Sequence, residues 1–547
     1  MRSSAPARGS RPNAMVWLSG MLVLTTKVVA KPYLDKDSTT TLFEWEMVDY
    51  DWDAIGISRE EAISRGEDAE LAAAQFHGAF IPKNNAITGL KWYDGDYYVT
   101  VPRWLPGVPS TMNKLVNTSD KYANPVLQPY PLNGTEPQLR YTQSMEIDYH
   151  GRMWMLDVGR LNFASSYAES GTPALVLWDM KKNKQLDRYE FPSSVASPDS
   201  SQLNDLVLDV PRKIAYISDT QGYAIVIVDM NSHESARFHG QPYTSSESSY
   251  KWTIGDVHYG NSTLGGGPDA IALTPNRKWL YWCPLQGTTM FKIKTKYLRW
   301  FLTGEKSLAE ALTHVTSVGS KRAASDGMAF ASNGILYSGG NANCMGDKYT
   351  SNNDHCLAVW AWDRNDPLFN TTNIADNLWA DTFAFDGSHN LLWTRNNLAS
   401  FFAGTMNFTD GTKNFRILQT HIYAGSYQLT AEKHQEAAHD NPVYIHPVYW
   451  VLMGTAIVLF MVTIFVVVAN KKKSARKKND TMNSRNQANS RSEGNENSFK
   501  FGQAVDVSNP TAADRDSGRE FAWSEDSFFG EDSMIQMPSD AAANNAL

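Results

Sequence analysis

A pattern that recurs along the chain places Asp205, Asp269 and Asp326 at equivalent positions, with Asn204 and Asp381 beside them. Asn204, Asp205, Asp269, Asp326 and Asp381 each lie at the start of a short apolar stretch. Carboxylates that converge on one point repel one another unless a cation, a protonated amine or bound protons offset their charge. These residues therefore predict a binding site for a small amine or aromatic ligand, or for Ca²⁺. The alternative is structural, with each Asp bonding backbone amides at a strand end or turn.

The pattern that carries these residues is a β-hairpin, and it occurs six times. Each copy has a short apolar strand, a turn with Asp, Asn or Gly, and a second apolar or aromatic strand. Successive copies begin 56 to 64 residues apart. They occupy residues 88–99, 144–155, 204–217, 268–282, 325–337 and 381–393.

A repeat of this length has room for four strands and long loops, which is one blade of a β-propeller. A third apolar strand follows most hairpins, as at Ala174–Asp179 and Ala224–Asp229. We therefore predict an all-β, six-bladed propeller over residues 31–430, with each sheet packed against its neighbours. The strand at 42–48 has no blade of its own, so we expect it to close the ring in the last one. A pair of β-sandwiches or a β-helix is the alternative, but the even spacing argues against both.

Composition supports one large folded domain and excludes some partners. Of the 547 residues, 12% are aromatic, which indicates a substantial core. The formal net charge of -8 provides no basic field for a phosphate backbone, so nucleic acid is not expected as a partner. The sequence has no Gly-rich phosphate loop, no H-E-x-x-H and no nucleophile elbow.

The two apolar segments predict how the chain sits in the cell. Residues 1–30 resemble a cleaved signal peptide, with a short signal anchor as the alternative. Residues 448–469 contain no charge and are followed by a lysine-rich run, which predicts one transmembrane helix with the C-terminus in the cytoplasm. A buried core helix is the alternative. We expect a type I plasma-membrane protein with an extracellular propeller, a stalk at 431–447 and a disordered cytoplasmic tail at 470–547, whose partner the sequence does not identify.

The predicted extracellular part carries glycosylation motifs and all three cysteines. N-x-Ser/Thr triplets begin at Asn117, Asn133, Asn261, Asn370 and Asn407. Cys344 and Cys356 lie in one polar loop and are close enough in sequence to form a disulfide. Cys283 follows an apolar aromatic strand, where we expect a buried, inert thiol.

Several motifs together resemble the yellow / major royal jelly protein family over about residues 40–420. They are 43–45, 101–111, 127–131, 151–159, 189–192, 203–205, 215–220 and 222–223. The resemblance implies a secreted six-bladed propeller, in agreement with the repeat count. The chain departs from the family at Tyr149 and His150, where a usual cysteine is replaced, and in its membrane span and tail.

The resemblance leaves two functions open, because the family includes pigmentation-associated, nutritive and amine-binding members. The first is a binding ectodomain that captures a small amine, an aromatic metabolite or another surface at the central channel. The second is an enzyme, either a dopachrome-converting tautomerase or a metal-dependent hydrolase that uses the axial carboxylates. His150 or an axial Asp is the candidate base for a tautomerase, although a solvated turn is the simpler interpretation of His150. The aromatic residues Tyr216, Tyr281, Tyr337 and Trp393 are expected to pack in the core rather than stack on a ligand. We assign no cofactor, with Ca²⁺ as the open alternative.

Overall fold

A computed structural model of the chain falls into two compact units, Met1–Tyr444 and Ile445–Leu547. In the first unit it describes residues 38–74, 78–116, 124–132, 139–244, 253–254, 257–258, 266–341, 357–367, 372–376 and 379–429. In the second it describes residues 463, 466–467 and 469–482.

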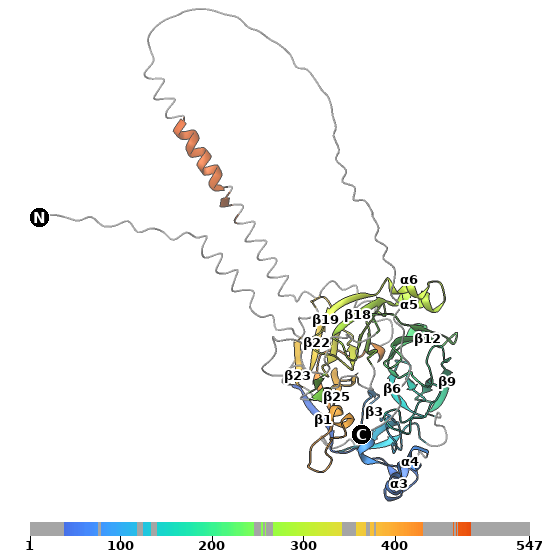
Figure 1. Cartoon of the computed structure of the whole chain (residues 1–547). Helices are drawn as coiled ribbons and strands as arrows, with labels where there is room; N and C mark the ends of the chain where they lie inside the picture. Colours follow the sequence, from blue (N-terminus) through green and yellow to red (C-terminus); the bar gives the residue numbers. More distant parts are fainter. Residues whose placement is uncertain are drawn as a thin grey trace, which may run out of the picture. The chain divides into compact units, whose positions relative to one another are not determined.

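The first unit contains six antiparallel sheets of four strands each (Figure 1). Blade 1 contains β2 (Leu90–Tyr93), β3 (Asp96–Thr100), β4 (Met112–Val116) and β5 (Val126–Pro129). Blade 2 contains β6 (Thr142–Ile147), β7 (Arg152–Asp157), β8 (Ala174–Asp179) and β9 (Lys184–Glu190). Blade 3 contains β10 (Leu203–Asp209), β11 (Ile214–Asp219), β12 (Ala224–Asp229) and β13 (Glu234–Phe238).

The remaining blades follow the same order along the chain. Blade 4 contains β16 (Pro268–Leu273), β17 (Trp279–Pro284), β18 (Thr289–Lys294) and β19 (Thr316–Ser320). Blade 5 contains β20 (Met328–Phe330), β21 (Ile335–Gly339), β22 (Ala358–Asp363) and β23 (Thr372–Asp376). Blade 6 contains β24 (Phe383–Phe385), β25 (Asn390–Asn396), β26 (Phe415–His421) and β1 (Thr40–Trp45).

The first strand of each hairpin forms the inner edge of its blade. The inner strands β2, β6, β10, β16, β20 and β24 contact one another in that order, and β24 contacts β2 again. This closed ring confirms the predicted six-bladed propeller. All six predicted hairpins are present as the two innermost strands of their blades.

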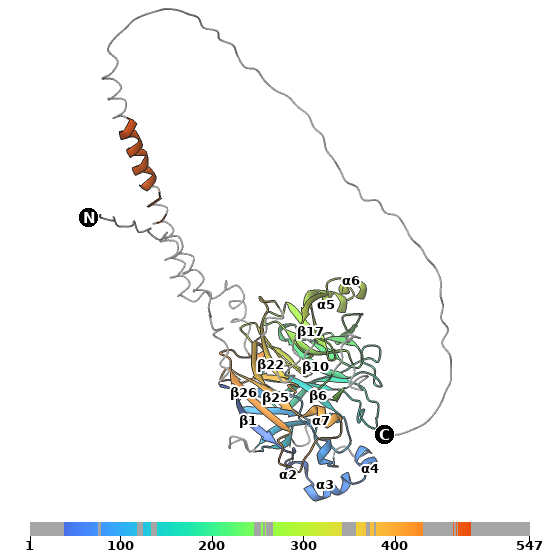
Figure 2. The ribbon, with the colours of Figure 1, turned by 60° about the vertical axis from the view of Figure 1, so that its left-hand side comes forward.

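The ring is closed by the N-terminal strand, as expected from the sequence. β1 pairs antiparallel with β26, with Thr40 opposite Gln419 and Trp45 opposite Phe415. In Figure 2, β1, in blue, lies beside the orange strand β26. The side chains of Phe43 and Trp45 are buried, so the first and last strands of the domain share one core.

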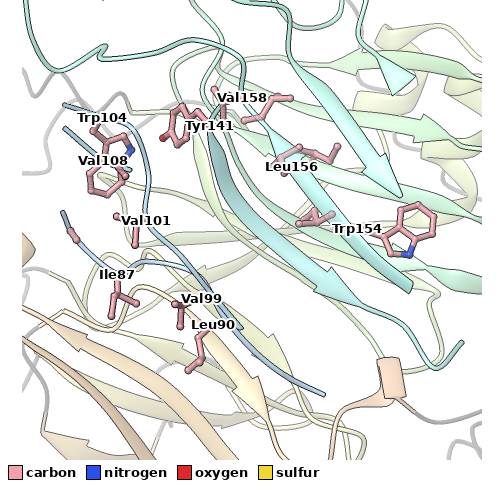
Figure 3. Close-up of a cluster of buried hydrophobic side chains, with 14 of the residues drawn as sticks. Ile87, Leu90, Val99, Val101, Trp104, Val108, Tyr141, Trp154, Leu156 and Val158 are labelled. Carbon is pink, nitrogen blue, oxygen red and sulfur yellow. The ribbon is translucent and has the colours of Figure 1, made fainter. Parts of the chain in front are cut away.

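The core lies between the faces of neighbouring blades. Strand residues alternate between the two faces of a sheet, and both faces are covered here, so the central strands are apolar along their whole length. Figure 3 shows one such cluster, to which blade 1 contributes Leu90 and Val99, which lie side by side, and blade 2 contributes Leu156. Trp154, Trp178, Trp282 and Trp393 are among the largest fully buried side chains.

Helices and short strands occupy the connections. They are α2 (Trp52–Ile55), α3 (Arg59–Gly66), α4 (Ala69–Ala74), α5 (Thr295–Leu302), α6 (Leu308–Leu312), α7 (Leu398–Phe402), the 3₁₀ turns η2 (Pro82–Asn84), η3 (Val210–Arg212) and η6 (Tyr427–Leu429), and the hairpin β14 (Thr253–Ile254) and β15 (Val257–His258). Of these, α7 and η6 bear on the central channel.

The described residues of the second unit are helical, including 470–482 at the start of the predicted tail. No described helix is both long and apolar enough to span a bilayer. Most of the predicted span at 448–469, and the rest of the predicted tail, lie outside the described residues.

Of the predicted glycosylation sites and cysteines, one of each lies among the described residues. Asn407 is exposed, and its Oδ1 accepts hydrogen bonds from Thr409 N and Oγ1 at 2.9 and 3.0 Å. Cys283 is a free, fully buried thiol, as expected. Asn117, Asn133, Asn261, Asn370, Cys344 and Cys356 lie outside the described residues.

Candidate functional site

The five predicted ligand-binding residues line one cavity on the propeller axis. Asn204, Asp205, Asp269, Asp326 and Asp381 all contribute to it. β-Bulges help to aim three of them, because pairing shifts between Leu203 and Leu206 in blade 3 and between Pro268 and Ile271 in blade 4. A bulge leaves a residue outside the regular ladder and redirects its side chain.

Three of the carboxyl groups lie close together and are buried. The carboxyl group of Asp326 lies close to those of both Asp269 and Asp381, near enough for a hydrogen bond when one group of a pair carries a proton. Burial, followed by the charge of Asp326, holds the pKa values of Asp269 and Asp381 well above the usual range for aspartate. Burial also raises the pKa of Asp326, although hydrogen bonds to its carboxylate oppose the effect. We call Asp269, Asp326 and Asp381 the carboxylate triad.

The triad needs protons or a cation to be stable. Trp379 Nε1 donates to Asp326 Oδ2 at 2.7 Å, and Thr220 Oγ1 donates to Asp269 Oδ2 at 3.2 Å. Asp381 Oδ2 faces no donor in the described part of the chain. Because two carboxylates cannot hydrogen-bond without a proton between them, the contact of Asp381 with Asp326 requires a shared proton.

A directional chain of amides leads away from Asp269. Asn204 Nδ2 donates to Asp269 Oδ1 at 2.6 Å, and Gln143 Nε2 donates to Asn204 Oδ1 at 2.8 Å. Gln143 Oε1 accepts from the Tyr141 hydroxyl and from Trp104 Nε1. Gln202 Nε2 then donates to the Tyr141 hydroxyl oxygen at 2.7 Å. Asn204 is therefore a link in this network.

This chain leaves one acceptor unused. Asp269 Oδ1 accepts from Asn204 Nδ2, and this contact fixes the orientation of each amide after it. At the far end, Gln202 Oε1 has no hydrogen-bond partner among the described residues, although Gln202 is only 5% exposed. Gln202 lines the same cavity as the triad. The site thus offers an acidic end and a separate neutral acceptor.

Aromatic side chains surround the mouth of the cavity at the starts of the inner strands. Trp104, Phe163, Trp379 and Phe402 line this opening together with Leu398 of α7. The rings of Trp104 and Phe402 lie 5.0 Å apart, and those of Trp379 and Phe402 lie 6.5 Å apart. The cavity volume here is about 40 Å³, room for a few water molecules or one ammonium group.

Asp205 lies deeper in the channel, and its role is largely structural. It accepts hydrogen bonds from Ser144 Oγ at 2.9 Å and from the Leu206 amide at 2.8 Å. Burial raises its pKa, and the charge of Lys91 lowers it in part. Lys91 Nζ lies 3.2 Å from Glu146 Oε2, so this level already has its own cation.

At the end of the channel opposite the mouth, the segment that follows the last blade reaches the axis. Residues 426–429 line the cavity there together with residues from all six inner strands. Tyr427 and Gln428 are buried, and Gln428 Nε2 donates to Leu208 O at 3.3 Å. We call residues 426–429 the plug.

The other sequence-based candidates lie away from the mouth. Tyr216, Tyr281, Tyr337 and Trp393 are buried in the blade cores, which confirms that they pack rather than line the site. His150 is exposed in the turn between β6 and β7 and does not line the cavity. Among described residues, no three or more His, Cys, Asp or Glu side chains are arranged to hold a metal ion.

Comparison with known proteins identifies the family. A family model described as "Major royal jelly protein" matches residues 142–425, from blade 2 to the end of the ring. The chain belongs to this family. "Protein yellow" of Drosophila guanche is 24% identical over 274 residues, which are 47% of this chain and 45% of that protein. "Protein yellow" of Drosophila pseudoobscura pseudoobscura is 24% identical over 303 residues, which are 52% and 50%. The chain spans about half the length of the curated relatives it matches.

Solved structures give weaker matches. A luciferin-regenerating enzyme is 11% identical with a TM-score of 0.36, covering 62% of this chain and 92% of that one. A calcium-binding regucalcin from Agrobacterium tumefaciens is 12% identical with a TM-score of 0.36, covering 62% and 91%.

Proposed function

We propose that this major royal jelly family protein binds a small aromatic amine at the mouth of its channel. The ammonium group would replace the shared protons of the carboxylate triad, and the ring would lie among the aromatic side chains above it. The observation that carries the proposal is the contact of Asp326 with both Asp269 and Asp381 beneath Trp104, Trp379 and Phe402.

Charge and packing favour this class of ligand. A cation relieves the repulsion within a buried carboxylate group, and a flat ring gains offset or edge contacts with indole and phenyl groups. Because this cavity has room for little more than an ammonium, the ring of the ligand would lie outside it, against the half-buried side chains of Phe163 and Phe402. A small pocket with apolar walls and a few polar groups is typical of small-molecule sites.

Calorimetry on the full-length protein tests the proposal. Serotonin and dopamine should bind saturably to the wild type and at least tenfold more weakly to Asp326→Ala and Asp381→Asn. Asp94→Asn is the matched control, because Asp94 is exposed in the β2–β3 turn, outside the cavity. Equal binding to the wild type and both triad variants would contradict the proposal.

An enzymatic role on the same residues is the second candidate. Carboxyl groups whose pKa values are raised by burial are able to act as general acids or bases near neutral pH, and Asp269 and Asp381 have this property. Dopachrome conversion needs one such group to remove a ring proton. Turnover of dopachrome by the wild type, lost in Asp381→Asn and kept in Asp94→Asn, would favour this role over binding alone.

We further propose that the propeller is extracellular and held by the segment at 448–469. The uncharged run with its lysine-rich flank and the exposed sequon at Asn407 support this topology. In intact cells, a glycosidase should shift the mobility of the wild type, and Asn407→Gln should remove one step of that shift. A propeller that external protease cannot reach in intact cells would contradict the topology.

A further inference from the structure

A buried lysine and the buried cysteine of blade 4 form a hydrogen-bonded pair. Lys321 Nζ donates to Cys283 Sγ at 3.0 Å. Cys283 is fully buried on β17, and Lys321, directly after β19, is 8% exposed. Apart from a 4.0 Å contact of Sγ with Ser325 O, neither side chain makes another hydrogen bond within the described residues, although Cys283 lies near enough to Asp269 for the two groups to interact electrostatically.

This arrangement is unusual for both groups. A buried ammonium normally faces a carboxylate, since an uncompensated charge is costly away from water. A thiol is a weak acceptor, so the lysine is best satisfied when the sulfur carries thiolate character. A thiolate is the form that reacts with peroxide, and the amine beside it is a nucleophile held in place by packing.

We propose that Cys283 and Lys321 form a reversible covalent crosslink when the protein meets hydrogen peroxide. The Cys283 thiol first attacks one peroxide oxygen, the O–O bond breaks, and sulfenic acid and water are formed. The neutral Lys321 amine then attacks the sulfur, the S–O bond breaks, and an S–N bond and a second water are formed. Sulfur loses two electrons, and peroxide gains them.

Geometry favours the second step over its competitors. The two reacting atoms already lie in contact, so little motion is needed to bring nitrogen to sulfur. Burial keeps glutathione and other bulky thiols from reaching the sulfenic acid, whereas peroxide is nearly as small as water. The product would join β17, a middle strand of blade 4, to the residue that follows the outer strand β19. The crosslink would therefore span β18, which lies between these two strands.

Peptide mapping of the full-length protein tests this inference. After treatment with peroxide, the wild type should give a linked pair of peptides that contain Cys283 and Lys321, lighter than their sum by two hydrogen atoms. Dithiothreitol should restore both free peptides. A Cys283 peptide that remains a thiol or becomes sulfinic acid, with no link to Lys321, would overturn the proposal.

Two variants separate the crosslink from damage to the fold. Lys321→Arg keeps the positive charge but lacks the nucleophilic amine, so it should accumulate sulfenic acid that dimedone traps. Cys283→Ser should show neither product. Both should unfold at the temperature of the untreated wild type to within a few degrees. If Lys321→Arg does not fold, the wild-type peptide map decides the question by itself.

Discussion

At the scale of single residues, the site depends on which groups carry protons. The amide chain from Asp269 to Gln202 has one orientation only, because Asp269 Oδ1 accepts from Asn204 Nδ2 at its acidic end. The triad, by contrast, is stable when its carboxyl groups share protons, because the ionised carboxylates would repel one another. In the proposed function, ligand recognition and the pH dependence of stability depend on the same carboxyl groups.

The triad should make the unliganded protein less stable as the pH rises. The folded-state pKa values of Asp269 and Asp381 are raised by burial, so the folded protein holds protons that the unfolded chain releases. Their contribution is full below the pKa of an unfolded aspartate, about 3.9, and is lost as the pH rises through the raised values. We expect the free energy of unfolding of Asp381→Asn to fall less steeply with rising pH than that of the wild type. Urea unfolding across this range measures both slopes, and parallel curves would contradict the prediction.

Gln202 should distinguish ligands by a donor on the ring. Its Oε1 is a buried acceptor with no partner in the described chain, so a phenol hydroxyl or indole N–H would satisfy it. Gln202→Leu should weaken binding of tyramine by about 3- to 10-fold, since a neutral hydrogen bond contributes about 0.5–1.5 kcal/mol. Phenethylamine, which lacks the hydroxyl, should lose much less. Equal losses for the two amines in calorimetry would contradict this role.

At the scale of elements, the inner strands and the loops differ in how far the sequence predicts them. The hairpin pattern marks equivalent positions, so the meeting of Asp269, Asp326 and Asp381 was predictable. The contribution of Gln143 to the site could also have been predicted, because Gln143 precedes Ser144 in blade 2 as Asn204 precedes Asp205 in blade 3. The aromatic mouth was not, because Trp104, Phe163 and α7 belong to connections whose positions depend on tertiary packing.

β1 offers a test of the ring closure. Phe43 is 2% exposed on this strand and packs in the same core as Ile417 of β26. Phe43→Ala should lower the free energy of unfolding by about 3–5 kcal/mol, as for other large buried aromatic side chains. Leu42→Ala, at a half-buried neighbouring position, is the control and should cost less. Denaturant unfolding measures both, and equal costs would argue that β1 does not hold the ring closed.

At the scale of the whole molecule, ligand binding and fold stability are linked. The triad residues belong to three different blades, so a cation there joins blades 4, 5 and 6. Of the fold itself, the number of blades and the closing strand were predictable from the repeat. The plug was not, because nothing in the short stretch 426–429 indicates that it turns back to the axis.

A bound amine should therefore stabilise the propeller as a unit. At a ligand concentration of about 100 times Kd, the gain is expected to be about 2.7 kcal/mol. Thermal unfolding with dopamine should shift upward in the wild type and in Asp94→Asn but not in Asp326→Ala. An equal shift in all three proteins would mean that dopamine binds elsewhere.

Among the described residues, the plug lines the end of the channel opposite the aromatic mouth. With Tyr427 and Gln428 at the opposite end, a ligand that enters past the rings of Trp104 and Phe402 is expected to leave by the same path. By microscopic reversibility, a substitution that narrows the entrance without changing the binding site lowers the association and dissociation rate constants by the same factor. The aromatic residues at the mouth would then determine the residence time of the ligand, while the carboxylate triad determines its affinity.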